Sequence, residues 1–129
     1  MASPEDQAVT KYIEEVAQST RDGLIVWKAA NPTTYYWDKI DATPTARLSL
    51  QQVERIAVAV ENGQQLQRRM LHYVFQVFDL SGPSATVRLS IDTTDRQALG
   101  DALRSLFETI KRMKLQSDLE FLKSTLPTR

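Results

Sequence analysis

The clearest alternation of apolar and polar residues lies between residues 85 and 91. Ala85, Val87, Leu89 and Ile91 are apolar and the three residues between them are polar. This period of two is typical of a half-buried β-strand. The preceding run has a second apolar face, and its members are Leu71, Tyr73, Phe75 and Val77. The pattern predicts strands over about 65–79 and 85–91 joined at Ser81-Gly82-Pro83.

The position of this loop determines how the two predicted strands pair. A short turn at Ser81-Gly82-Pro83 places the apolar faces together with three cross-strand pairs. These pairs are Val77 with Val87, Phe75 with Leu89, and Tyr73 with Ile91.

A helical period appears at the start of the chain. Ser3 is a favourable N-cap, Pro4 suits the first helical position, and Gly23 suits the left-handed conformation that closes many helices. Between them the apolar residues recur at helical spacing, namely Val9, Tyr12, Ile13, Val16 and Ala17. We predict an amphipathic helix over residues 4–21.

A second helical pattern follows the predicted strands. Thr94 and Gln97 have the spacing of a capping box. The apolar residues after them are Ala98, Leu99, Ala102, Leu103, Leu106, Phe107, Ile110 and Met113. We predict a helix over 95–114, and Ser117 with Glu120 predicts a new start and a short helix over 118–126.

The segment 24–40 is rich in aromatic and β-branched residues and is interrupted by Asn31-Pro32. Such residues favour strands, and the interruption favours a turn. We predict strands over about 24–30 and 33–40.

Residues 46–60 fit two interpretations. Ser49 and Gln52 allow a capping box and a helix, whereas Asn62-Gly63 is the preferred turn of a two-residue β-hairpin. The strand is favoured because that turn places Leu48 opposite Val77 and Leu50 opposite Phe75, on the apolar face. The hairpin is then unusually long, and residues 55–70 are predicted to project from the core.

These elements predict an α+β fold in a single domain, residues 1–129. Strands joined by short turns imply an antiparallel meander of four to five strands, with the N-terminal and C-terminal helices packed on one face. A chain of 129 residues is long enough to bury a core of its own.

The amino-acid composition excludes several kinds of functional site. The 16 basic and 16 acidic residues cancel, which removes the usual electrostatic signature of a nucleic-acid-binding protein. There is no cysteine and one histidine, so thiolate catalysis and Cys-rich or His-rich metal sites are excluded. Residues 1–12 have no signal-peptide pattern and no run of about 20 apolar residues is present, so we expect a cytoplasmic protein without a membrane segment.

No pattern indicates a catalytic, cofactor-binding or metal site, and we expect no enzyme. The four glycines are scattered and form no phosphate-binding motif. The basic residues Lys111, Arg112 and Lys114 are explained by the negative end of the predicted helix.

The candidate interaction residues lie on the predicted hairpin and near the aromatic cluster. They are Tyr36, Arg55, Arg68, Arg69, Met70 and His72. Tyr36 is expected on the face opposite Tyr35 and Trp37, and His72 is expected to face away from the core beside Val53.

Three functions are compatible with this arrangement. The first is a small interaction module that associates with itself or another protein, because a projecting ribbon with open edges and apolar side chains favours a partner chain. The alternative is a nucleic-acid-binding module that uses the hairpin arginines and Tyr36. The third is a small-ligand binder or enzyme around Trp27 and Trp37.

Overall fold

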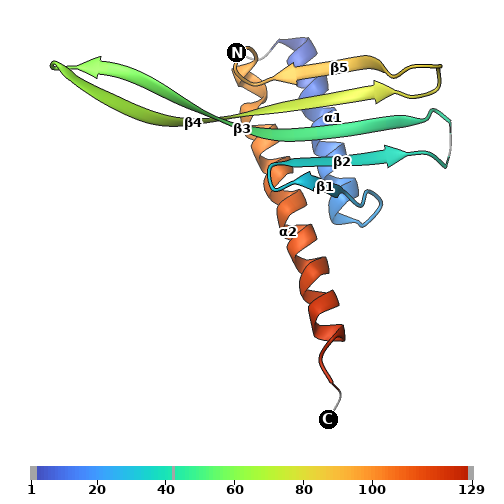
Figure 1. Cartoon of the computed structure of the whole chain (residues 1–129). Helices are drawn as coiled ribbons and strands as arrows, with labels where there is room; N and C mark the ends of the chain where they lie inside the picture. The colour runs from blue at the N-terminus through green and yellow to red at the C-terminus, as the bar shows by residue number, and fades with distance from the viewer. Residues whose placement is uncertain (1–2, 42, 128–129) are drawn as a thin grey trace.

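The computed structural model describes residues 3–41 and 43–127, which form one open antiparallel sheet and two α-helices. The strands follow one another in chain order, β1-β2-β3-β4-β5, so the sheet is a meander. Both helices lie on the same side of it, as Figure 1 shows. The predicted α+β class and topology are confirmed.

The elements have the following bounds: α1 Pro4–Arg21, β1 Lys28–Asn31, β2 Thr34–Lys39, β3 Ala46–Glu61, β4 Gln64–Asp79, β5 Thr86–Asp92, the 3-10 helix η1 Gln97–Leu99, and α2 Gly100–Ser124.

The core lies between the helices and the inner face of the sheet. The sheet contributes Leu50, Phe75 and Ile91, each fully buried, and α2 contributes Leu103, Leu106, Phe107 and Ile110. The Phe107 ring contacts Tyr35 and Tyr73, with ring centroids 5.4 and 5.6 Å apart. One residue of α2 thus joins β2 to β4.

The start of α1 follows the sequence prediction. The Ser3 hydroxyl accepts a hydrogen bond from the Asp6 backbone N–H at 3.1 Å, and Gly23 has a φ of +78° after the helix. This positive φ favours glycine over other residues.

The strand predicted over 24–30 is wrong for its first half, because β1 begins only at Lys28. The backbone N–H groups of Leu24 and Ile25 donate to the Ser19 carbonyl oxygen at 2.9 and 3.2 Å, so the end of α1 takes the groups that a strand would use. The Trp27 indole N–H donates to the Thr20 hydroxyl at 2.9 Å and fixes the connection against α1.

Residues 46–61 are a strand, as the sequence favoured. The turn at Asn62 and Gly63 has φ values of 52° and 76°, as a type I′ turn requires. The predicted register is confirmed, with Leu48 opposite Val77 and Leu50 opposite Phe75.

The predicted pairing of β4 with β5 is wrong by two residues. Ile91 lies opposite Phe75 and Leu89 lies opposite Val77, whereas Val87 lies opposite Phe78 beyond an irregularity. The connection between Asp79 and Thr86 is longer than a tight turn, and the Asp79 carboxylate accepts a hydrogen bond from the Ser81 backbone N–H at 2.9 Å. A shift of two residues keeps both apolar faces on the same side of the sheet.

The two helices predicted over 95–114 and 118–126 are one continuous helix, α2, which begins only at Gly100, after the 3-10 helix η1, and ends at Ser124. The capping box of Thr94 and Gln97 does not form, because the Thr94 backbone N–H donates to the Asp92 carboxylate at 2.9 Å. No glycine or proline lies between residues 114 and 118, so no residue there interrupts the helix. Lys111, Arg112 and Lys114 therefore lie in mid-helix, and the helix-end explanation for them is wrong.

Candidate interaction surfaces

The outer half of the β3–β4 hairpin leaves the body of the protein. We call residues 54–71 the arm. β2 pairs with β3 only as far as Gln51, and β5 pairs with β4 only from Val74 onward, so the arm is a ribbon of two strands. Figure 1 shows it extending sideways from the sheet.

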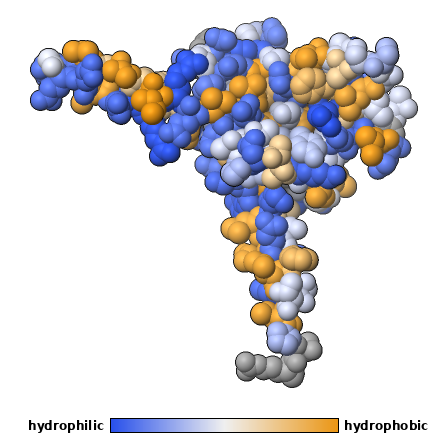
Figure 2. All heavy atoms as spheres, viewed as in Figure 1, coloured by the Kyte–Doolittle hydropathy of each residue, from blue (hydrophilic) through white to orange (hydrophobic). Residues whose placement is uncertain are grey.

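Both faces of the arm expose apolar side chains. Ile56, Val58 and Val60 follow Leu48 and Leu50 in the alternation of β3, but no helix covers them, and they are 60%, 59% and 70% exposed. Met70, on the other face, is 54% exposed. Figure 2 shows apolar and polar patches alternating along the arm. The arm therefore exposes apolar residues of the kind that are buried elsewhere in the sheet.

One ion pair crosses the arm. The Arg69 guanidinium binds the Glu54 carboxylate through two hydrogen bonds, of which Nη2 to Oε2 measures 3.0 Å. The hydrogen bond from Arg69 holds the pKa of Glu54 below its usual range. Arg69 is thus neutralised by its own hairpin, while Arg55 and Arg68 form no ion pair within the described residues.

A cavity of about 290 Å³ lies at the base of the arm and brings several predicted residues together. Its lining includes Arg55, Met70 and His72, with Thr94 and Gln97 on the opposite side. The His72 Nε2 atom lies 3.9 Å from the Asp92 carboxylate. As predicted, His72 lies beside Val53 in the sheet.

Tyr36 is separated from the other candidates. It lies on β2 and on the outer face of the sheet, as predicted, while Tyr35 points into the core. The Arg47 guanidinium lies over its ring, 5.2 Å from the centroid, and Arg47 also binds the Asp38 carboxylate at 2.8 Å. The face of Tyr36 is therefore partly covered by its own sheet.

Trp27 and Trp37, proposed above as lining a ligand pocket, belong to the core region. Trp27 is buried and its indole N–H is satisfied by Thr20, and Trp37 packs against the core cluster. A groove of about 520 Å³ between α1 and the sheet includes Tyr12, Leu24 and Trp37. This groove exists because two helices do not cover the full width of five strands.

The second half of α2 also leaves the body. The last buried residue of α2 is Ile110, and the helix continues to Ser124. The exposed apolar residues of this segment are Leu115, Leu119, Phe121 and Leu122, and Leu126 follows just after the helix. Figure 2 shows apolar patches on the projecting helix. The sequence pattern predicts two separate helices here and therefore does not predict this surface, although the spacing of the leucines can be seen in the sequence.

Among residues 3–41 and 43–127, no helix has the length and apolarity needed to span a membrane. The same part of the chain contains no group of three or more His, Asp or Glu side chains arranged to hold a metal ion. Comparison of the chain with protein-family models, with curated proteins and with solved structures gives no significant match.

Proposed function

We propose that this protein is a self-associating interaction module whose arms pair edge to edge through β3. The observation that carries this proposal is the outer half of β3, where Ile56, Val58 and Val60 are exposed beside a strand edge that no described strand occupies. A two-stranded ribbon is marginally stable in water, and an open edge is a template for another strand.

The backbone of β3 has the orientation that such pairing requires. The Gln52 N–H donates to the Thr33 carbonyl oxygen at 2.8 Å, on the side of β2. Because backbone groups alternate along a strand, those of Ile56, Val58 and Val60 point toward the same side, beyond the end of β2. They are the donors and acceptors that a neighbouring strand would use.

A two-fold axis at Val58 gives a self-complementary antiparallel register. Ile56 then lies opposite Val60 of the partner subunit, and Val58 lies opposite its own copy. The same register places Arg55 opposite Glu61 of the partner subunit, so opposite charges meet twice on the other face. The partner strand would pair with the open edge of β3 from Arg55 to Glu61.

The arm gives less support to nucleic-acid binding. Glu54 neutralises Arg69, and the remaining Arg55 and Arg68 are accompanied by the acidic Glu61. Base stacking needs an open aromatic face, and Arg47 lies over Tyr36. Ligand binding around Trp27 and Trp37 and a cytoplasmic location stay predictions from the sequence.

Charge reversal at the proposed contact tests this function. Arg55→Glu places two carboxylates opposite each other, and Glu61→Arg places two guanidiniums opposite each other. Each cross-strand charge pair contributes about 0.2–1 kcal/mol, so reversing two pairs costs about 2 kcal/mol, or roughly thirtyfold in the dissociation constant. We expect each variant alone to lose mass in light scattering coupled to size exclusion.

Mixing the two variants provides the decisive measurement. In a mixed pair, the carboxylate introduced by Arg55→Glu lies opposite the guanidinium introduced by Glu61→Arg, and the unchanged Arg55 of one chain lies opposite the unchanged Glu61 of the other. An equimolar mixture should therefore recover the wild-type mass. Arg68→Glu is the control, because it reverses a charge on β4, away from the β3 edge. Wild-type mass for both single variants, or no recovery on mixing, would contradict the proposal.

A further inference from the structure

The outward face of α2 changes its character where the helix leaves the sheet. Along the body this face is polar and exposed, with Asp101, Ser105, Glu108 and Arg112. Beyond it the same positions of the helical repeat hold Leu115, Leu119, Leu122 and Leu126, which are 48–68% exposed. Single exposed leucines are common, but leucines repeated along one face of a helix form a continuous apolar stripe, and such a stripe indicates a contact.

The spacing of these leucines identifies the kind of contact. They are separated by four, three and four residues, which is the alternation of a and d positions in a heptad repeat. Leu115 and Leu122 take d positions and Leu119 takes an a position within α2, which ends at Ser124. Leu126 follows at the spacing of the next a position, in the turn that closes the helix, where its backbone N–H donates to the Lys123 carbonyl oxygen at 3.2 Å. Such a narrow stripe fits another helix bearing the same stripe.

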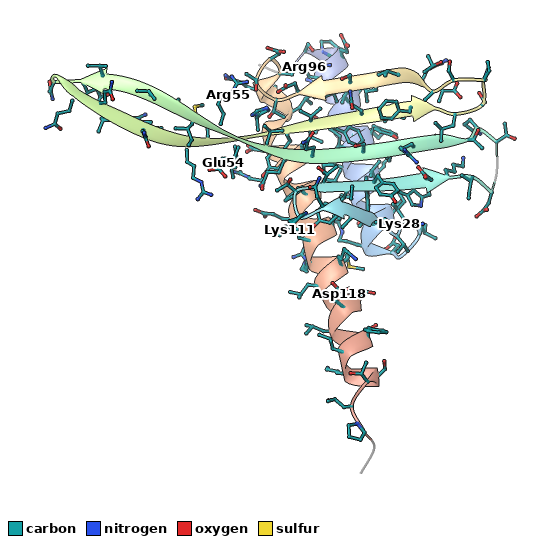
Figure 3. The ribbon with its side chains drawn as sticks, viewed as in Figure 1. Lys28, Glu54, Arg55, Arg96, Lys111 and Asp118 are labelled. Atoms are coloured by element: carbon teal, nitrogen blue, oxygen red, sulfur yellow. The ribbon has the colours of Figure 1, made fainter. Side chains whose placement is uncertain are left out.

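The flanking charges select an orientation. Asp118 takes a g position and Lys123 the following e position, and in a parallel pair of helices g meets e of the partner. Asp118 then faces Lys123 of the partner subunit, and the symmetry repeats the attraction. In an antiparallel pair g meets g and e meets e, so Asp118 and Lys123 would not meet. Figure 3 shows Asp118 on the projecting part of the helix, where its ion-pair partner among the described residues is Lys114.

We infer that the end of α2 forms a parallel two-fold coiled coil with the same segment of a second copy of this chain. The contact extends the proposed self-association but does not depend on the arm. The arm and the end of α2 project in different directions from the body, as Figure 1 shows. One two-fold axis cannot serve both contacts, so together they build an assembly of four or more chains.

The variant Leu119→Gln/Leu122→Gln tests the contact. Both side chains are exposed, and glutamine preserves the helix, so the fold of the monomer should be unaffected. The mass in light scattering should fall at least twofold. The control is Phe121→Gln, which removes an exposed side chain from another side of the same turn and should leave the mass unchanged. Wild-type mass for the double variant would overturn the inference.

Cysteine cross-linking tests the orientation, because the chain contains no cysteine of its own. In a parallel pair Leu122 meets its own copy, so Leu122→Cys should form a disulfide-linked dimer under mild oxidation. Phe121→Cys should link far less. In an antiparallel pair residue 122 meets residue 119, and Leu122→Cys would fail to link. Failure to link would overturn the parallel coiled coil even if the double glutamine variant loses mass.

Combination with the arm variants separates the two contacts. Arg55→Glu alone should leave a dimer joined through α2, and Leu119→Gln/Leu122→Gln alone should leave a dimer joined through the arms. The triple variant should be a monomer. A monomer produced by Arg55→Glu alone overturns the contact through α2 and leaves the arm proposal standing. A mass unaffected by Arg55→Glu overturns the arm proposal and leaves the inference standing.

Discussion

The inner and outer halves of the β3–β4 hairpin are built from the same two strands, yet they have opposite environments. In the inner half Leu50 and Phe75 are fully buried beneath the helices. In the outer half Ile56 and Val58 continue the same alternation of β3 and are more than half exposed. The hairpin runs without a break from one environment to the other.

This contrast shows that alternation determines which face of a strand is apolar, whereas the neighbouring elements determine whether that face is buried. Phe107 of α2 packs on Tyr73 in the inner half, whereas Ile56, Val58 and Val60 in the outer half are 59–70% exposed. The apolar residues of the outer half contribute little to the isolated monomer. Their free energy becomes available when another chain covers them.

The largest predicted difference compares Leu50 with Ile56. Leu50→Ala creates a cavity in the core and should lower the free energy of unfolding by about 2–5 kcal/mol. Ile56→Ala, on the same face of the same strand, should lower it by less than about 1 kcal/mol, because little buried contact is lost. Urea unfolding at low protein concentration, where the chain is monomeric, measures both. Equal losses would show that the arm belongs to the cooperative core.

A second prediction concerns a polar group that the body must satisfy internally. The Thr20 hydroxyl donates to the Val16 carbonyl oxygen at 2.8 Å and accepts from the Trp27 indole at 2.9 Å. Thr20→Val leaves the buried indole N–H without an acceptor, so unfolding should become easier by about 1–3 kcal/mol. Trp fluorescence during urea unfolding measures this change.

Thr109→Val is the matched control for that substitution. Thr109 is equally buried in a helix and donates to the Ser105 carbonyl oxygen at 2.8 Å. No other side chain donates to it within the described residues, so its replacement should change stability little. A similar loss in the two variants would contradict the role assigned to the indole hydrogen bond.

The sequence predicts the parts of this fold that depend on local pattern. The start of α1, the Asn62-Gly63 turn and the β3–β4 register are confirmed because each depends on a few neighbouring residues. The predicted β4–β5 register is wrong because the two strands are joined by a six-residue connection and not by a tight turn. The Asp79 side chain accepts a hydrogen bond from the Ser81 backbone in this connection. The predicted interruption of α2 is wrong. Ser117 with Glu120 resembles the start of a helix, but extending an existing helix is easier than starting a new one.

The candidate surfaces could be predicted only in part. The sequence predicts the arm and its arginines, because apolar and polar residues alternate on both sides of the Asn62-Gly63 turn. The hairpin that results is longer than the core of a domain of this size. The neutralisation of Arg69 by Glu54 was not visible, because it depends on the diagonal geometry of two strands. The leucine stripe of α2 can be recognised as a surface only from the structure, in which α2 continues to Ser124 but has no buried residue after Ile110.

The smallest predicted effect compares two ion pairs under acid conditions. Arg96 binds Asp6 and joins the loop before α2 to the start of α1, and this hydrogen bond lowers the pKa of Asp6 in the folded chain. In the arm, Arg69 lowers the pKa of Glu54 in the same way, but its side chain is 76% exposed. A carboxyl group whose pKa is lower in the folded state stabilises the fold at neutral pH. That stabilisation is lost as the pH falls through the usual carboxyl range and then through the folded pKa.

Asp6→Asn should therefore lower stability at pH 7 and flatten the loss of stability between about pH 5 and pH 2. Glu54→Gln should flatten it much less, because water competes for the exposed arginine and the ribbon can open without the body. Urea unfolding repeated over this pH range measures both slopes. An equal flattening by the two variants would mean that the arm unfolds together with the body, and the two halves of the hairpin would then form one cooperative unit despite their different burial.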